Sequence, residues 1–183
     1  RRNHEFADVV KQSRKFLKLG QFDDQDEANL APIGPDGWPT TDFRVLAMAG
    51  QQATQNLAGA YAIAFTGQAD LAVGGGGGGT ISGKNFDAGT NTTRATLNFP
   101  AGAENMIVDF TNTGGAVKNL RIVRPGLDPD APPLLTPAWS SHAGRFSILR
   151  FMDWTRTNGN RHVAWADRTT PEKLRTEAWI AQW

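Results

Sequence analysis

Short stretches of alternating hydrophobic and polar residues occupy the middle of the chain. Tyr61, Ile63 and Phe65 alternate with alanines, which is the two-residue period of a strand with one apolar face. Because Thr66-Gly67-Gln68 separates this strand from the next one, we expect a hairpin there. The pattern predicts a mainly β protein, an antiparallel β-sandwich of jelly-roll-like type between residues 43 and 124. The expected strands are residues 43–48, 60–65, 69–73, 94–99, 106–110 and 117–123.

The two ends of the chain show different patterns. Phe6, Val9 and Val10 follow the i, i+3, i+4 spacing of an amphipathic helix, so we expect a helix within residues 5–19 that ends at Gly20. Near the other end, a strand-like run over residues 148–154 leads into a polar loop and then a helix over residues 171–183. In such a strand–loop–helix unit, polar residues lie at the carboxyl end of the strand, where α/β folds bind ligands.

These patterns divide the chain into three regions. We predict an N-terminal helix and β-sandwich domain over residues 1–126, a Pro-rich linker over residues 127–143 and the strand–loop–helix unit over residues 144–183. The linker is predicted because proline makes a segment stiff and extended. The last region has the form of a single βα unit, so the chain reads as a complete small domain followed by the first unit of something larger.

The overall composition argues against several classes of function. A formal net charge of +1 over 183 residues gives no electrostatic basis for nucleic-acid binding. The absence of cysteine excludes disulfides and thiolate chemistry, and the apolar runs are too short to span a membrane. Gly74 to Gly79 lack the Lys-Ser/Thr ending of a phosphate-binding loop, so we expect a flexible hairpin tip.

Few residues offer catalytic or metal chemistry. Ser140, Ser141 and His142 are adjacent in the sequence, which is not the geometry of a catalytic triad. Asp153 and Asp167 flank a polar loop, but nothing in the sequence fixes the distance that the acid pair of a glycosidase requires. We therefore predict no catalytic residue and no cofactor. Two Asp-x-Asp pairs are weak candidates for structural calcium and are otherwise solvated loop acids: Asp24 with Asp26, and Asp128 with Asp130.

Tryptophan is the residue type that most suggests binding. The chain has six, and four of them lie within its last 30 residues. A Trp ring stacks on the face of a sugar while neighbouring Asn, Asp or Arg side chains bond to its hydroxyls. The alternative for each is burial. Trp179 and Trp183 have the i, i+4 spacing that predicts one buried stripe on a helix. The candidate carbohydrate-binding residues are Trp38, Asp153, Trp154, Asn158, Trp165 and Arg168.

A succession of motifs extends over nearly the whole chain. They are DGWPTTDF at residues 36–43, GAY with FTGQA within residues 59–69, NLRIVRPG at residues 119–126, and LRFMDW, TN and WADR within residues 149–168. This succession resembles the N-terminal portion of large secreted bacterial proteins in which a β-sandwich precedes a glycoside-hydrolase-like (β/α) barrel, some of them described as cellulose-binding. The resemblance implies that residues 148–154 form the first barrel strand and that the catalytic acids lie on later strands. Asp153, Trp154 and Asn158 would then at most line the cleft.

Three functions remain open. The favoured one is a non-catalytic, secreted or extracellular module that recognises a polysaccharide by aromatic stacking. One alternative is a structural subunit of an extracellular or viral assembly, with a homo-oligomer formed through the C-terminal helix. The other is a fragment of a glycoside hydrolase whose catalytic acids lie outside this chain. Polysaccharide binding by a monomer would favour the first, and a large defined assembly the second.

Overall fold

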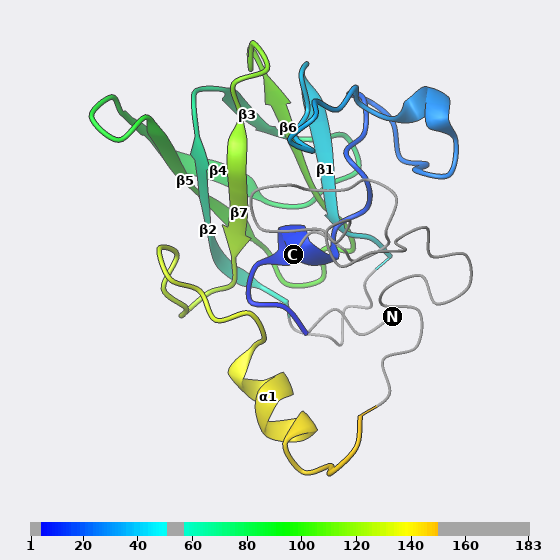
Figure 1. Cartoon of the computed structure of the whole chain (residues 1–183), viewed down its shortest axis with the longest axis vertical. Helices are drawn as coiled ribbons and strands as arrows, with labels where there is room; N and C mark the ends of the chain where they lie inside the picture. Colours follow the sequence, from blue (N-terminus) through cyan, green and yellow to red (C-terminus); the bar gives the residue numbers. More distant parts are fainter. Residues whose placement is uncertain (1–4, 51–56, 150–183) are drawn as a thin grey trace.

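The computed structural model describes residues 5–50 and 57–149, and two antiparallel β-sheets dominate this part of the chain (Figure 1). One sheet has three strands in the order β1-β6-β3, and the other has four in the order β4-β5-β2-β7. The sheets pack face to face, so the predicted antiparallel β-sandwich is confirmed. The strands are β1 (Phe43–Met48), β2 (Gly59–Thr66), β3 (Asp70–Val73), β4 (Thr80–Asp87), β5 (Thr92–Phe99), β6 (Met106–Thr111) and β7 (Lys118–Val123).

The chain crosses between the two sheets after almost every strand. Among the strands described, only β4 and β5 are consecutive strands of one sheet. The strands β2 to β6 take the places of strands B to F in the immunoglobulin-type Greek key, whose sheets are ABED and CFG. The first strand, β1, lies in the place of G beside β6, and the last strand, β7, in the place of A beside β2. This strand order is more specific than the jelly-roll-like fold that we expected. It describes the fold and carries no statement about function.

The segment between β2 and β3 is a corner rather than the predicted hairpin. The strand β2 pairs with β5 and β7, whereas β3 pairs with β6 in the other sheet. At the corner, Gly67 has a φ of +93°, and its N–H donates to the carbonyl of Asn91 at 2.8 Å. The hairpin prediction was wrong because a short Gly-containing turn suits both arrangements, and only the partner strands decide between them.

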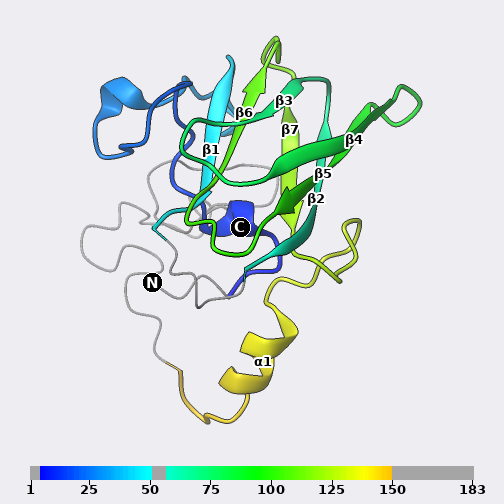
Figure 2. The same ribbon diagram turned by 180° about the vertical axis from the view of Figure 1, so that it is seen from behind.

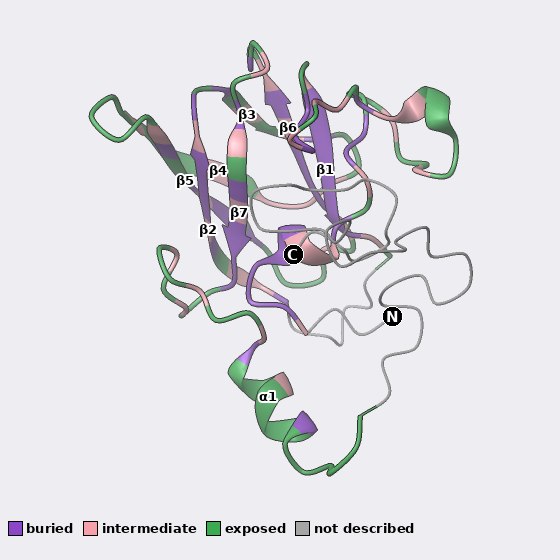
Figure 3. Ribbon diagram, viewed as in Figure 1, coloured by how far each residue is buried: buried purple, intermediate pink, exposed green. Residues whose placement is uncertain are grey.

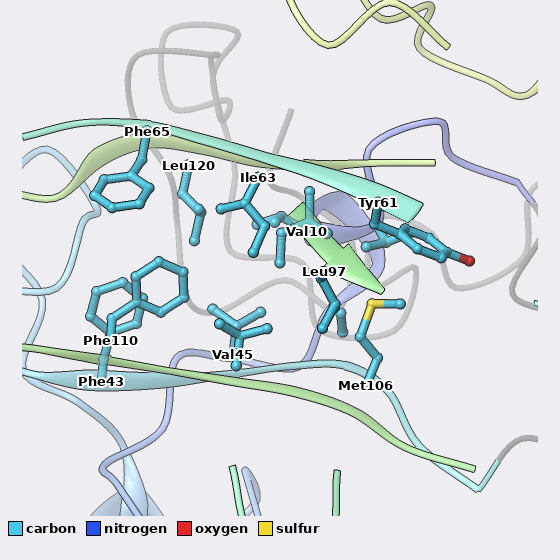
Figure 4. Packing of buried hydrophobic residues seen from close by; sticks show 14 of the residues in the cluster. Val10, Phe43, Val45, Tyr61, Ile63, Phe65, Leu97, Met106, Phe110 and Leu120 are labelled. Atoms are coloured by element: carbon cyan, nitrogen blue, oxygen red, sulfur yellow. The ribbon is translucent and has the colours of Figure 1, made fainter. Parts of the chain in front are cut away.

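The hydrophobic core lies between the inner faces of the sheets (Figure 4). Phe43 and Phe110 stack with ring centroids 4.7 Å apart, and Phe65 of the opposite sheet meets Phe110 edge-on at 5.6 Å. Tyr61 and Ile63, which the sequence places on the apolar face of their strand, are each 1% exposed. Burying a large apolar side chain contributes about 1.5–3 kcal/mol. Burial of the apolar residues of this alternating pattern is therefore the main contribution that holds the two sheets together.

The N-terminal segment is not the predicted amphipathic helix. It forms a single 3₁₀ turn, η1 (Val9–Gln12), between two extended stretches. Before the turn, the carbonyl of Ala7 accepts from the N–H of Arg124, beside β7, at 2.9 Å. After it, Leu17 exchanges two backbone hydrogen bonds with Arg44 of β1, at 3.0 and 2.7 Å. The segment thus covers one edge of each sheet. Pairing with an open strand edge gives its backbone N–H and C=O groups hydrogen-bond partners, while its apolar side chains still reach the core.

The six consecutive glycines connect the two sheets instead of forming a hairpin tip. They lead from β3 to β4, and their backbone passes close to neighbouring segments. A Cβ on Gly78 would lie 2.4 Å from the Cβ of Ala103, and one on Gly79 would lie 2.4 Å from the carbonyl oxygen of Asn98. Gly79 also has a φ of +104°. This packed crossover requires glycine for close approach and for backbone conformation.

The Pro-rich segment after β7 loops out at one end of the sandwich and leads to a short helix that lies beyond the sheets (Figure 1 and, from behind, Figure 2). The N–H of Thr136 donates to the carbonyl of Glu5 at 2.8 Å, which ties the segment to the N-terminal stretch. The helix α1 (Pro137–Ala143), which the sequence patterns did not predict, follows directly. The Thr136 hydroxyl accepts from the N–H of Trp139 at 3.2 Å, which is an N-cap with proline at the first helical position.

Candidate functional site

One outer face of the sandwich is covered and the other is largely open. The N-terminal segment covers the three-stranded sheet, where Leu17 clusters with Leu46 and Ile107. On the same face Arg44 is 3% exposed and forms a bidentate ion pair with Asp109, at 2.7 and 2.9 Å. Figure 3 shows β1 buried along its length and the hairpin tip between β4 and β5 exposed. The open outer face of the four-stranded sheet is therefore the candidate functional site.

Polar side chains form two rows on this open face, along β4 and β5. In β5, alternate residues are buried, and the residues between them point outward. The outward residues pair across the ladder with polar residues of β4: Asn98 with Thr80, Thr96 with Ser82, Arg94 with Asn85 and Thr92 with Asp87. The Asn98 amide donates to the Ser82 hydroxyl at 3.1 Å. We call these eight side chains the polar face.

Three of the eight residues of the polar face were visible in the sequence. The alternation over residues 94–99 identifies Arg94, Thr96 and Asn98 as outward residues of β5, whereas Thr92 lies before the predicted strand. The strand β4 was missed because six of its eight residues are polar or glycine. The other two, Ile81 and Phe86, are only partly buried, and only one of them pairs with a large apolar residue. A bulge between Ser82 and Asn85, with Gly83 at a φ of +62°, further breaks the two-residue period.

Alanines continue this surface onto β2. Ala60, Ala62 and Ala64 lie directly opposite Asn98, Thr96 and Arg94 of β5. The methyl side chains of Ala60 and Ala62 remain partly or fully exposed, whereas Ala64 is only 1% exposed. The polar face is thus bordered by small side chains, which leave the longer Asn and Arg groups beside them accessible.

Two arginines flank Ala64 and contact the same residue of the Pro-rich segment. Arg94 of β5 and Arg121 of β7 are both register partners of Ala64. The Arg94 guanidinium donates to the Asp130 carboxylate at 2.6 Å, and Arg121 donates to the Asp130 carbonyl at 3.0 Å. The Nε of Arg121 is buried without a hydrogen-bond partner among the described residues. Asp130 therefore bridges two cations that the fold places side by side.

The Asp87 carboxylate lies at the hairpin end of the polar face. It accepts hydrogen bonds from the Thr90 hydroxyl at 2.9 Å and from the Gly89 N–H at 2.8 Å. These bonds, led by that of Thr90, hold the pKa of Asp87 below its usual range. This carboxylate is therefore ionised at neutral pH and stabilises the turn between β4 and β5.

Trp38, predicted as an exposed platform for a sugar, is a core residue. It is 4% exposed, and its ring lies 6.0 Å from that of Phe16. The loop turns the ring inward: the N–H of Gly34 bonds to the carbonyl of Trp38 at 2.9 Å, and the Trp38 N–H to the Asp36 carboxylate at 3.2 Å. The prediction was wrong because the sequence showed a Trp in a Pro/Gly loop, and only the folded loop decides which way the ring points.

The other predicted carbohydrate-binding residues lie outside the described part of the chain. Their roles therefore stay predictions, as does the strand–loop–helix unit that carries them. They are Asp153, Trp154, Asn158, Trp165 and Arg168.

The four aspartates considered for calcium serve turns and ion pairs. Asp26 caps the short 3₁₀ turn η2 (Glu27–Asn29), and Asp24 lies 3.6 Å from Arg14. Asp128 accepts from the N–H of Asp130, whose own carboxylate pairs with Arg94. Within residues 5–50 and 57–149, no three His, Asp or Glu side chains gather in a way that could hold a metal ion.

Comparisons with known proteins do not assign the chain to a family. No protein-family model, curated protein or solved structure matches it. The resemblance to secreted bacterial proteins therefore stays a prediction. Within the described ranges, none of the helices has the length and apolar character needed to cross a membrane.

Proposed function

We propose that this chain is a non-catalytic module that binds a polysaccharide on the polar face. The observation that carries the proposal is the pair of in-register rows of hydroxyl, amide and guanidinium groups on an open sheet face. Sugars present closely spaced hydroxyls, which such donors and acceptors bind. The strands β4 and β5 are eight residues long, so at ~3.3 Å per residue the rows extend over roughly 25 Å. An extended saccharide chain of several rings matches that length.

The contacts of the nearby acids support a binding role rather than hydrolysis. A glycosidase needs two carboxyl groups facing one bond across a cleft. On the polar face Asp87 is bound within its turn, and the neighbouring Asp130 is bound to Arg94. Both carboxylates thus accept hydrogen bonds from this chain's own side chains or backbone, which suits structural groups better than a general acid.

The stacking part of the proposal rests on residues beyond the described ranges. With Trp38 in the core, Trp154 and Trp165 remain the proposed aromatic platforms. The hydrogen-bonding part rests on β4 and β5, whose positions are fixed by the sheet. The proposal also places the module outside the cell, where polysaccharides of walls and matrices are found.

A structural subunit of an assembly is the second candidate. The observation in its favour is the apolar run that follows α1. Phe146, Ile148 and Leu149 are 55%, 87% and 43% exposed. Exposed apolar runs of this kind often become buried against a partner. Light scattering on the purified protein separates a monomer from an assembly.

Affinity electrophoresis through gels containing neutral and acidic polysaccharides tests the first candidate. The variant with Ser82→Ala, Thr96→Ala and Asn98→Ala removes three hydrogen-bonding groups from the centre of the polar face. We expect at least tenfold weaker retardation, with unchanged unfolding in urea. The control is Gln25→Ala, which removes an exposed amide from the loop before η2, away from the polar face in the sequence and in the sheet order. Retardation by no polysaccharide, or equal retardation of both variants, would overturn the proposal.

A further inference from the structure

The contact between Arg94, Arg121 and Asp130 is a weak internal ion pair at one point of the polar face. The side chains of Arg94 and Asp130 are 49% and 61% exposed. Exposed ion pairs contribute little to stability, because water solvates both partners well and the long side chains lose freedom in pairing. The contact therefore opens at little cost.

The two guanidinium groups keep hydrogen-bonding capacity beyond what Asp130 uses. Each guanidinium has five N–H donors in a planar fork that matches a carboxylate. Asp130 gives its carboxylate to Arg94 and only its backbone carbonyl to Arg121. The Nε of Arg121 also has no partner in the described part of the chain, but this atom is buried, so the terminal N–H groups of the two arginines are the donors that a ligand would use. A planar anion placed between them would gain bonds that the internal contact does not make.

The surroundings of the arginine pair select among anions. The hydroxyl and amide groups of Thr96, Asn98 and Ser82 continue from Arg94 along the same face. A ligand that offers both a carboxylate and hydroxyls can use the arginines and these groups together. The nearby Asp87 carboxylate disfavours a densely charged polyanion, and the chain as a whole has a net charge of only +1.

We propose that Arg94 and Arg121 bind the carboxylate of a uronic-acid unit in an acidic polysaccharide, and that Asp130 occupies this site as an internal competitor. This inference rests on the proposed function and names its ligand class. Binding exchanges one carboxylate for another at Arg94 and adds bonds at Arg121. Release of Asp130 frees the turn of the Pro-rich segment that Arg94 and Arg121 hold by these hydrogen bonds.

Polygalacturonate and its methyl-esterified form are the paired ligands for the test, because they share a backbone and differ in charge. Affinity electrophoresis at neutral pH compares the wild type with Arg94→Met, Arg121→Met and Asp130→Asn. We expect the two arginine variants to bind polygalacturonate at least tenfold more weakly. We expect Asp130→Asn to bind it about two- to fivefold more tightly, which is the gain from losing an exposed ion pair. The esterified ligand should respond to none of the three changes.

The ion pair of Arg14 and Asp24 provides matched controls beside the other sheet. Arg14 is 44% exposed and lies 3.6 Å from Asp24. Arg14→Met and Asp24→Asn change the net charge as the test variants do, and they should leave binding unchanged. Because Arg94 is exposed, Arg94→Met still tests the inference if Arg121→Met does not fold.

The outcomes separate this inference from the proposed function. Equal retardation by both forms of polygalacturonate would overturn the uronate site and leave polysaccharide binding standing. Failure to bind any polysaccharide would overturn both. Stronger retardation by dextran sulfate than by polygalacturonate would indicate general attraction to polyanions and overturn the uronate site. An unchanged affinity of Asp130→Asn would overturn the role of Asp130 as a competitor.

Discussion

The buried carboxylate of Asp8 makes the stability of this protein depend on pH in an unusual direction. Asp8 is 4% exposed, and one of its oxygens accepts from the N–H groups of Val10 and Ile122, both at 3.0 Å. It thereby fixes the turn η1 to β7. Burial raises the pKa of Asp8 from 3.8 to about 6, although these two hydrogen bonds oppose the rise. The folded protein therefore binds a proton at Asp8 more tightly than the unfolded chain does.

The size of the effect follows from this pKa. One pKa unit corresponds to about 1.4 kcal/mol, so a rise from 3.8 to about 6 corresponds to ~3 kcal/mol. The folded state binds more protons than the unfolded state between these values, so its stability falls as pH rises. The contribution is fully present below pH 3.8 and is lost as pH passes 6. Asp8→Asn keeps an oxygen acceptor for both N–H groups and removes the titration.

Urea unfolding of the wild type and Asp8→Asn from pH 3.5 to pH 8, followed by tryptophan fluorescence, measures this contribution. The wild type should lose about 2 kcal/mol relative to the variant between pH 4 and pH 6.5, which is most of this contribution. Asp42→Asn is the control with the opposite sign. The N–H of Thr113 is the main cause that lowers the pKa of Asp42, so its stabilisation is lost as pH falls through that lowered pKa. Parallel stability profiles for the wild type and Asp8→Asn would refute the reasoning.

Three further predictions concern stability and are measured by the same unfolding assay at pH 7. Asp109→Ala should destabilise the protein by ~3–5 kcal/mol, because Arg44 would remain buried without its carboxylate partner. The double variant Arg44→Met with Asp109→Leu should recover most of this loss. A loss below 1 kcal/mol for Asp109→Ala would contradict the reasoning. Trp38→Ala should lower the free energy of unfolding by ~3–5 kcal/mol, because it truncates a core side chain. Trp38→Phe should leave polysaccharide retardation in affinity electrophoresis unchanged. Reduced retardation of a folded Trp38→Phe variant would show that Trp38 contributes to binding. Gly79→Ala should destabilise the protein by about 2 kcal/mol or more, because its Cβ would meet a carbonyl oxygen. Gly75→Ala, whose Cβ meets nothing within 4 Å, should change stability by under 1 kcal/mol. Equal effects of the two variants would show that the crossover has room to adjust.

The strands were predictable where their residues face one core. In β2, Tyr61, Ile63 and Phe65 point inward and small residues point outward, so the two-residue period is visible in the sequence itself. The strand β4 was missed because it is an edge strand whose residues are mostly exposed. Such a strand is specified by the backbone of its neighbour β5 more than by burial of its own side chains.

The N-terminal segment shows how tertiary contacts override a local pattern. Phe6, Val9 and Val10 have helical spacing, and all three are buried, as that spacing predicts. They reach the core from an extended stretch and a single 3₁₀ turn, because the backbone finds partners in β7 and β1. A spacing that covers only one turn does not distinguish these two ways of burying the same side chains.

The candidate site depended on contacts that are distant in the sequence. No sequence motif joins Arg94, Arg121 and Asp130. The two arginines come together because β5 and β7 are both neighbours of β2. The sequence drew attention instead to tryptophans, and the fold places Trp38 among the core residues.

The sequence by itself determined the fold class of this protein, because the period of apolar residues along each strand decides which faces must leave water. It also determined the absence of thiol chemistry and the small net charge, which are properties of composition. Only the tertiary structure decided which strands are neighbours, which outer face is covered and which side chains meet on the open one. These depend on the competition among all strand edges and loops for partners, and that competition is settled by contacts between residues far apart in the chain.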